Sequence, residues 1–367
     1  MTTVLRITAK ALTCLLALAA VAAAYGGHID PHLWATPSLL TLAYPYIAIL
    51  TLAIGIIWLC CRRYTPAIIC GVALASGCGT LLVNMPVAMH KSAKPGEKQF
   101  SLMTYNILHG VDARGRTCNT NRSVDYVLAS KADIVCLQEL YSLSSKEVPS
   151  LTNSQLDAIE KAYPYRIEGK TTPMTLLSKY PVTFVKSGRV SSWLDIYALY
   201  RVSIAGHTVH LLNLHLASYN LSDKEREVMT DIHGVRSARN SISRFKGSIL
   251  AKMKKSYRDR AADAEAVREL LDSIKGTVIV CGDFNDVPAS WAYRKVRGDD
   301  MSDAYADTGF GLMNTYNMHG FWFHIDHVLY RGEVRPLSVQ KGSVDYSDHF
   351  PLIASFALTP KKTQKKK

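Results

Sequence analysis

Apolar residues crowd into the first quarter of the chain. From Ala11 to Met89 the histidine and charged side chains are few: His28, Asp30, His32, Arg62 and Arg63. Two uncharged runs, 38–61 and 65–83, each come close to the roughly 20 residues with which a helix crosses a bilayer. We predict a transmembrane helix in each run.

An earlier apolar run, residues 5–25, has two interpretations. Basic residues Arg6 and Lys10 stand at its start, and Ala22–Ala24 offers the small residues of a signal-peptide cleavage site. No helix break precedes Tyr25, which favours an uncleaved first helix. A cleaved signal peptide remains the alternative.

Basic residues also predict which way the helices run. Arg6 and Lys10 lie at one end of the first helix, and Arg62 and Arg63 lie between the second and third. Positive residues favour the cytoplasmic side of a membrane. We therefore predict a multi-pass anchor over 1–90, a polar linker over 91–99, and an extracytoplasmic (periplasmic or extracellular) location for the rest.

Beyond the linker, strand-length apolar runs alternate with amphipathic segments. Helical spacing of apolar residues marks 123–131 and 261–274. Such interleaving predicts an α/β domain over residues 100–358. Seven apolar runs with polar ends predict its strands: 100–107, 132–140, 174–185, 207–217, 277–285, 324–330 and 351–358.

This domain is basic. Four of the 43 Lys and Arg, and one of the 30 Asp and Glu, lie in residues 1–90, so residues 91–367 carry ten surplus positive charges. That surplus suits an anionic substrate or surface. A basic insertion over 219–260 is expected to form one or two amphipathic helices, as a lid, a membrane contact or a solvated face. The Lys-rich tail, 359–367, is expected to be a solvated run that leans on anionic headgroups.

Cysteine placement predicts neither a disulfide framework nor a zinc site. Five of the eight cysteines lie in the apolar segments. The other three, Cys118, Cys136 and Cys281, are an odd number, and two of them fall inside predicted strands.

Polar side chains stand at the ends of the predicted strands. The run VIVC, 278–281, stops at Gly282 and is followed by Asp283 and Asn285. Alone, this could be an ordinary polar turn. The same placement recurs at Asn106, Glu139, His215, Asp326, Asp348 and His349. So many oxygen ligands, amides and imidazoles predict one site for a divalent cation and an oxyanion.

The order of the motifs TYNI, LQE, NLHL, GDFN, IDHV and SDH resembles the endonuclease/exonuclease/phosphatase superfamily over roughly residues 99–358. The resemblance implies a four-layer α/β/β/α sandwich of two mixed sheets with the site at one end. It also implies metal-dependent hydrolysis of phosphoester bonds.

The resemblance assigns a metal-binding role to three of these residues. Glu139, aided by Asn106 and Asp348, resembles the Mg²⁺ ligand set, with Mn²⁺ as the alternative ion. A shell with few carboxylates keeps several waters, which suits Mg²⁺. The ion would neutralise a non-bridging phosphate oxygen and the leaving oxygen.

The other five residues are implied to act on water and phosphate. Asp283 resembles the residue that orients and deprotonates the attacking water, and Asn285 the residue that donates to the phosphate. Asp326 pairs with His349, and His215 faces the same phosphate, so that two imidazoles donate to the transition state.

Three further histidines near these motifs, His109, His324 and His327, are interpreted as rim or packing residues. His324 stands where many relatives have Arg, which puts one substrate contact in doubt. After His215 the chain reads LHLASYNLSD, without the Tyr-x-Pro-Asn segment of abasic-DNA repair nucleases. This favours the deoxyribonuclease and sphingomyelinase branches.

Three functions stay open. A membrane-anchored phosphoesterase acting on a lipid-linked phosphodiester or phosphomonoester is favoured, because anchoring raises the effective concentration of substrates in the same membrane. A tethered nuclease acting on DNA or RNA is the second hypothesis, and an inactive binding domain is the third. The sequence indicates no protein partner.

Overall fold

The computed structural model describes residues 3–169, 172–191, 194–219, 222, 239–318 and 321–359. Residues 360–367 of the predicted Lys-rich tail, and nearly all of the predicted insertion before residue 239, lie outside the described residues.

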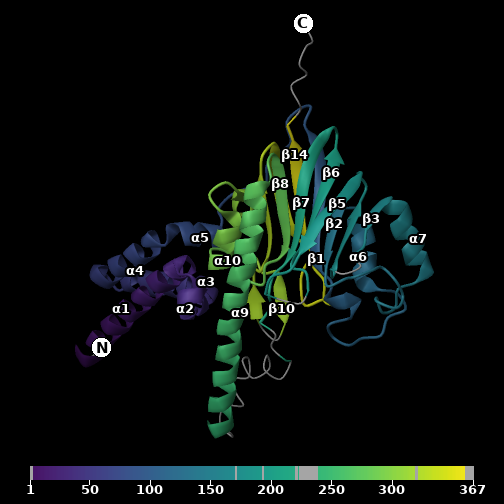
Figure 1. Cartoon of the computed structure of the whole chain (residues 1–367). Helices are drawn as coiled ribbons and strands as arrows, with labels where there is room; N and C mark the ends of the chain where they lie inside the picture. The colour runs from purple at the N-terminus through teal and green to yellow at the C-terminus, as the bar shows by residue number, and fades with distance from the viewer. Residues whose placement is uncertain are drawn as a thin grey trace.

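Two six-stranded sheets form the centre of the domain (Figure 1). The first has the order β13-β14-β1-β2-β4-β3 and the second β5-β6-β7-β8-β12-β9. The first comprises β1 (Lys98–Asn106), β2 (Ile134–Gln138), β3 (Tyr165–Ile167), β4 (Met174–Ser178), β13 (Val334–Lys341) and β14 (Leu352–Leu358). The second comprises β5 (Val182–Gly188), β6 (Tyr197–Ile204), β7 (His207–His215), β8 (Thr277–Asp283), β9 (Ser302–Asp303) and β12 (Asp326–Arg331). A hairpin of β10 (Tyr316–Met318) and β11 (Phe321–Phe323) stands apart.

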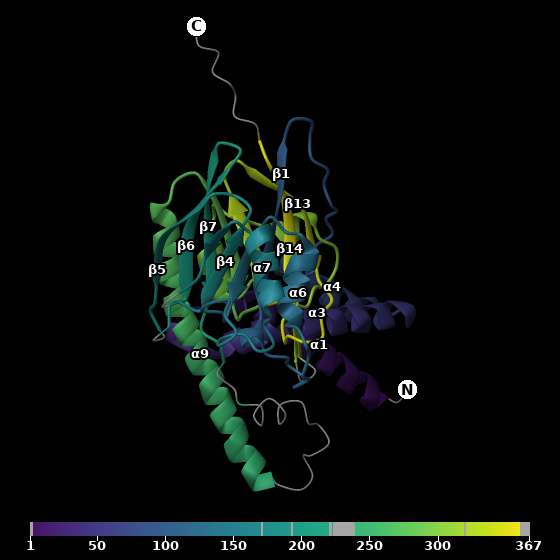
Figure 2. The same ribbon diagram turned by 90° about the vertical axis from the view of Figure 1, so that its right-hand side faces the viewer.

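Helices cover both outer faces of the sheet pair. Figure 2 shows α6 (Arg122–Ser130) and α7 (Asn153–Ala162) on one side and α9 (Arg239–Ser273) on the other. Two short helices, α10 (Trp291–Arg297) and α11 (Ala304–Thr308), complete the domain.

Three apolar clusters correspond to the spaces between these layers. One, with Leu102 and Ile279, lies between the sheets. The second packs Val127 of α6 on the first sheet, and the third packs Val267 of α9 on the second. The four-layer α/β/β/α sandwich predicted from the sequence is confirmed.

Both sheets place a parallel pair at their centre. β1 runs parallel to β2, and β7 runs parallel to β8, while every other neighbour is antiparallel. The carboxyl ends of these four strands lie at the same end of the sandwich (Figure 1). The residues that end them are therefore brought together.

The predicted strand 174–185 is wrong as a single element. β4 belongs to the first sheet and β5 to the second, so the chain crosses between sheets after Ser178. The Ser178 hydroxyl donates to the Tyr180 carbonyl and accepts from its N–H, which closes a turn. Pro181 follows and has no N–H for a strand ladder. Six further strands were not predicted from the sequence: β3, β6, β9, β10, β11 and β13.

The boundary predicted at residue 260 does not exist as a structural break. Helix α9 runs without interruption from the basic insertion into the predicted helix 261–274. Its last half packs on the second sheet, and its first half continues past the strand ends where the site lies (Figure 1). The sequence of α9 contains no Pro and a single Gly, Gly247, so its composition favours a continuous helix.

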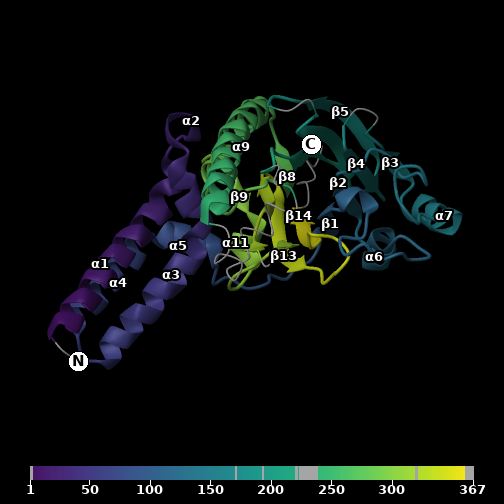
Figure 3. The same ribbon diagram turned by 90° about the horizontal axis from the view of Figure 1, so that it is seen from below.

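The N-terminal residues form α1 (Thr3–Tyr25), η1 (Gly26–His28), α2 (Pro31–Trp34), α3 (Thr36–Cys60), α4 (Tyr64–Ser76) and α5 (Cys78–Asn84). Among the described residues, Val4–His28 and Thr36–Cys60 are each long and apolar enough to cross a membrane. Figure 3 shows α1, α3 and α4 side by side, projecting from one flank of the sandwich.

The third predicted helix, 65–83, is not straight. α4 and α5 meet at an angle of 71°, so this segment is a broken span or a re-entrant loop. Gly and Ser at a helix break are a recognised cause of kinks, and the break falls at Ser76 and Gly77. At the bend, the Tyr25 hydroxyl donates to the Ser76 carbonyl, and the Tyr44 hydroxyl donates to the Gly77 carbonyl, which also accepts from the Leu81 N–H.

The bundle contacts the sandwich directly. Arg294 of α10 donates to Thr80 of α5, and Asn84 donates to the carbonyl of Pro288. Tyr46 of α3 donates to the carbonyl of Trp322 in β11 at 2.8 Å. These contacts fix α3 beside the end of the sandwich that carries the predicted site.

Candidate active site

All eight predicted site residues meet at one end of the sandwich. A pocket of about 150 Å³ is lined by six of them: Glu139, His215, Asp283, Asn285, Asp348 and His349. The other two, Asn106 and Asp326, are each 1% exposed and support the pocket from behind. These residues come from five strand ends and one loop, as the spacing of the motifs predicted.

Asn106 joins the two sheets at the site. Its amide nitrogen donates to Glu139 Oε1 and to Asp283 Oδ2, each at 3.1 Å. Its amide oxygen accepts from the Leu108 N–H. The amide nitrogen, not the oxygen, therefore faces the carboxylates in this arrangement.

The donor set suits a divalent cation. The Glu139 and Asp283 carboxylates both accept from the Asn106 amide. No Lys or Arg of the described residues forms a hydrogen bond or an ion pair with either carboxylate; their neighbours are Asn106 and three histidines. Two carboxylates that share one amide donor are costly together unless positive charge, from the neighbouring imidazoles or from a bound metal ion, neutralises them. Oxygen ligands of this kind are those that Mg²⁺ prefers.

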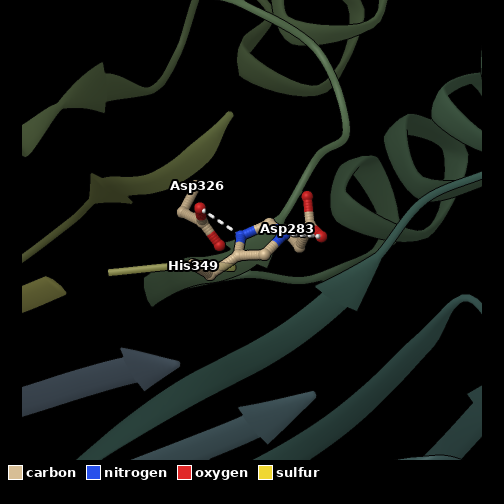
Figure 4. Close-up of side chains that lie close together, drawn as sticks. All are labelled: Asp283, Asp326 and His349. Carbon is tan, nitrogen blue, oxygen red and sulfur yellow. Dashed lines mark hydrogen bonds and ion pairs between the residues drawn. The ribbon is translucent and has the colours of Figure 1, made fainter. Parts of the chain in front are cut away.

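His349 bridges two buried carboxylates (Figure 4). Its Nδ1 lies 2.9 Å from Asp326 Oδ2, and its Nε2 lies 3.5 Å from Asp283 Oδ2. Burial opposes protonation of this imidazole, but the Asp326 and Asp283 carboxylates outweigh burial and raise the His349 pKa well above its usual value. Burial raises the pKa of Asp326 to about 6. The Asp326–His349 pair therefore retains a proton near neutral pH.

Asp283, Asp326 and His349 lie close enough together to be an alternative metal site. Ligand atoms of Asp283, Asp326 and His349 lie within 4.8 Å of one another. A cation bound there would compete with the imidazole for both carboxylates. Their geometry fits the predicted pairing of Asp326 with His349.

Four other histidines near the motifs lie in three different places. His215 is near both sheets' carboxylates, with Nε2 at 3.6 Å from Glu139 and 3.8 Å from Asp283. His109 lies on the rim, 61% exposed and 3.5 Å from Glu139. His324 and His327 are buried, with ring centroids 4.7 Å apart, and burial lowers the pKa of each. These two pack in the interior.

The loops that carry the last polar residues are held by short hydrogen bonds. Ser347 donates to the carbonyl of Asn106 and accepts from the His349 N–H, which fixes the segment around Asp348. The Asn285 amide donates to the carbonyl of Leu216. Asn285 also lines the pocket, so one of its two amide hydrogens is engaged in holding the loop.

Backbone conformation explains Gly282. Its φ is +140°, and a Cβ there would lie 2.0 Å from the carbonyl oxygen of Leu214 in β7. Only glycine lets β8 approach β7 so closely just before Asp283. Glu139 and Asn285 also adopt positive φ, at 57° and 52°, conformations that are uncommon for residues with a side chain and that cluster at functional sites.

Sequence reasoning missed a buried arginine behind the site. Arg260 of α9 is fully buried between Tyr219 and Tyr257, with its guanidinium carbon 4.4 and 4.9 Å from their ring centroids. Its Nη1 lies 4.0 Å from Asp286, the residue after Asn285, and among the described residues its three nitrogens have no hydrogen-bond partner. Within a run of eleven basic residues nothing marked this one.

Sequence reasoning also missed the apolar wall of the pocket. Leu42 of α3 lines it, together with Leu108, Met253, Phe323 and Ile325. Leu42 lies in a segment that the sequence assigned only to the anchor. The membrane-type helix thus contributes directly to the catalytic pocket.

Comparison with known families places most of the domain in one family. A profile of the Endonuclease/Exonuclease/phosphatase family matches residues 103–349. The chain belongs to this family, whose fold serves phosphoesterases and nucleases. Residues 6–83 match a family described as a domain of unknown function (DUF8431). A search among curated proteins finds no match.

Solved structures of low sequence identity resemble the chain. Truncated TDP2 from Caenorhabditis elegans is 19% identical, with a TM-score of 0.44 over 70% of this chain and 97% of the other. Sphingomyelinase C from Streptomyces griseocarneus is 16% identical, with a TM-score of 0.41 over 70% and 99%. The human Nocturnin catalytic domain is 14% identical, with a TM-score of 0.43 over 72% and 98%.

Proposed function

We propose that the protein is a membrane-anchored, divalent-cation-dependent phosphoesterase that hydrolyses a lipid-linked phosphodiester or phosphomonoester on the extracytoplasmic side. The observation that carries the lipid assignment is Leu42: a side chain of an apolar, membrane-length helix lies in the wall of the pocket that holds Asp283 and His349. A substrate in the same bilayer reaches this pocket without leaving the membrane surface.

The metal-binding role falls to Glu139, with Asn106 and Asp348 beside it. Bound Mg²⁺ or Mn²⁺ would supply charge neutralisation at a phosphate oxygen and at the leaving oxygen. Asn106 has a second role, because its amide holds the Glu139 and Asp283 carboxylates at equal distances.

Water activation falls to Asp283. This carboxylate is 1% exposed, and its Oδ1 accepts from the Asn285 N–H, which leaves Oδ2 turned toward Asn106 and the histidines. It can accept the proton of a water that attacks phosphorus in line with the leaving oxygen. General-base catalysis of this kind contributes about 10²–10⁴-fold.

Charge on the phosphate is met by His349, His215 and Asn285. His349 is held as a proton carrier by Asp326, and the Nε2 atoms of His349 and His215 lie 3.5 and 3.8 Å from the same oxygen, Asp283 Oδ2. Preorganised donors of this kind cost little reorganisation during the reaction, and each is worth about 2.7–4 kcal/mol.

The side of the membrane follows from the basic residues. Arg6 and Arg63 line one groove of the helix bundle together, so they lie at the same end of it. The contacts with the sandwich come from Tyr46, in the first half of α3, and from Asn84, at the end of α5. Both residues are distant from Arg63 along their helices. The positive-inside rule then favours a catalytic domain outside the cytoplasm.

The test is a substrate panel with full-length protein and its Asp283→Ala variant. The substrates are bis-p-nitrophenyl phosphate, sphingomyelin and other phospholipids in mixed micelles, polyprenyl phosphates, and plasmid DNA, each with and without Mg²⁺. We expect Mg²⁺-dependent turnover of a lipid substrate by the wild type only. Cleavage of DNA alone would make the protein a tethered nuclease, which its basic domain also suits.

A further inference from the structure

A second hollow adjoins the catalytic pocket. It has a volume of about 130 Å³ and lies between α3 and β11. Leu42 and Phe323 line both hollows, so the two meet at these side chains. Its other walls include the side chains of Pro45, Tyr46, Leu312, Met313 and Trp322. We call this hollow the α3 groove.

The α3 groove is uncharged. Among the described residues, no Asp, Glu, Lys or Arg lines it. His324 forms part of its wall, and burial lowers the pKa of that imidazole well below its usual value, so it is neutral at physiological pH. The catalytic pocket, by contrast, has carboxylates and imidazoles beside its apolar wall, so the joined hollows have one charged and one uncharged end.

The rim of the α3 groove has the composition of a membrane interface. Tyr46 is 50% exposed and Trp322 63% exposed, and the Tyr46 hydroxyl is bonded to the Trp322 carbonyl. Leu312 beside them is 48% exposed. Tyr and Trp are enriched where hydrocarbon meets headgroups, because each has an apolar body and a polar tip.

The length of α3 also places the groove near the interface between hydrocarbon and headgroups. Arg62 and Arg63 follow Cys60 and do not enter hydrocarbon readily, so the inner boundary of the bilayer core falls near Cys60. A helix rises about 1.5 Å per residue. A core of about 30 Å therefore ends roughly 20 residues earlier, near Thr41. Leu42 then lies at the outer boundary, level with the glycerol or phosphate region of a lipid.

We propose that the α3 groove binds the hydrocarbon chain of a membrane lipid whose phosphoester lies in the catalytic pocket, so that α3 is part of the substrate site as well as an anchor. This proposal rests on the proposed function. The occupant is a lipid of the same bilayer: a phosphoester between His215 and His349 has Leu42 and Phe323 on one side. A chain attached to it crosses these two residues into the groove and keeps its methylenes away from water.

Two chromogenic substrates test the groove. Methyl p-nitrophenyl phosphate and dodecyl p-nitrophenyl phosphate share the reacting phosphodiester and differ only in the chain. In both, water attacks phosphorus, Asp283 accepts the water's proton, and p-nitrophenolate leaves with the electrons of its P–O bond. For full-length protein in mixed micelles we expect kcat/KM to be at least tenfold higher for the dodecyl ester.

Matched tryptophan variants locate the effect. Leu312→Trp fills the α3 groove and is expected to lower the dodecyl-to-methyl ratio at least tenfold. Leu52→Trp makes the same change on α3 at a side chain that is 52% exposed and outside the groove. It is expected to leave the ratio within twofold of the wild type. An equal ratio in all three proteins would overturn the proposal.

A binding measurement separates this proposal from the proposed function. A dodecyl phosphate with a diazirine on its chain is photolysed with the protein in liposomes, and labelled residues are mapped by mass spectrometry. Labelling within 42–46 and 312–323 that falls in Leu312→Trp supports the groove even if no substrate turns over, an outcome that would count against the proposed function alone. Turnover of the methyl ester without chain preference or labelling would sustain the phosphoesterase and refute the groove.

Discussion

The two sheets of the sandwich share a plan but differ in what their ends carry. Each centres on a parallel pair, β1 with β2 and β7 with β8. The first sheet ends in Asn106 and Glu139, an amide and a carboxylate that suit a cation. The second ends in His215 and Asp283, with Asp326 on the neighbouring strand, and these can move protons. The strand order brings these residues to one site. We propose that the side chains of the first sheet bind the cation and that those of the second transfer protons.

The outer helices differ in the same way. On the first sheet, α6 and α7 are short and begin with side-chain caps from Asn121 and Thr152. On the second, α9 has 35 residues, reaches past the strand ends and carries the buried Arg260. The second sheet also faces the membrane-type helices through α10 and β11. The residues proposed to transfer protons and the contacts with the membrane-type helices therefore lie on the side of the second sheet.

The largest expected effect is on the proton-handling half. Asp283→Asn keeps the shape of the side chain but removes the base, and should lower kcat by about 10³–10⁴-fold, near the upper range for general-base catalysis. The check is kcat on the best substrate of the panel, with the thermal midpoint as a control for folding. A rate within tenfold of the wild type would mean that Asp283 is not the base and that proton transfer is not assigned to the second sheet.

Arg260 should matter for stability more than its neighbours do. Arg260→Met leaves the Asp286 carboxylate buried without its nearby cation, which should lower the free energy of unfolding by about 3–5 kcal/mol. The measurement is denaturant unfolding of the protein in detergent. Arg258→Met, an exposed change on the same helix, should stay within about 0.5 kcal/mol of the wild type.

A double variant separates charge from packing at Arg260. Arg260→Met with Asp286→Asn removes both charges and should recover much of the lost stability, because no unpaired charge remains. If the double variant is as unstable as Arg260→Met, the stacking of Arg260 on Tyr219 and Tyr257 is what holds this part of α9.

The metal-handling half should respond through cation affinity. Asn106→Ala removes the amide that holds Glu139 and Asp283, and should raise the Mg²⁺ concentration needed for half-maximal activity about 10–100-fold. A Mg²⁺ titration after chelation with EDTA measures it. Saturating Mg²⁺ should recover much of the activity of Asn106→Ala but not of Asp283→Asn, and equal behaviour of the two would contradict the division between the sheets.

The smallest effect should come from the helices of the first sheet. Thr152 and Gln155 form a reciprocal capping box at the start of α7, so Thr152→Ala should cost about 1 kcal/mol of stability. Thr152→Ser keeps the hydroxyl and should restore most of it. Activity per folded molecule should not change, because α7 contributes no residue to the pocket.

The residues of the candidate site could be proposed from the sequence because they lie in contiguous motifs at strand ends. Asp283 and Asn285 follow an apolar strand in GDFN, and Asp348 and His349 stand in SDH. A buried parallel strand forms a continuous apolar run, and a polar residue directly after the run lies at the end of the strand. All eight predicted residues meet for this reason, although their chemical roles remain proposals.

Other features gave no local signal. The chain crosses between sheets at Tyr180 and Pro181 within one apolar run. The apolar composition continues across the crossing, although β4 is buried throughout and β5 is largely exposed. Arg260 looks like any other basic residue of its helix until Tyr219 and Asp286 are placed beside it. The bend at Gly77 depends on hydroxyls from Tyr25 and Tyr44, which are distant in the chain.

By itself, then, the sequence determined the class of fold and the apolar helices and proposed the residues of the candidate site, since periodicity and short motifs are local properties. Only the tertiary structure decided that Leu42 belongs to the catalytic pocket and that Arg260 lies behind it. Contacts between segments hundreds of residues apart depend on how helices and sheets pack, and packing is a property of the whole chain.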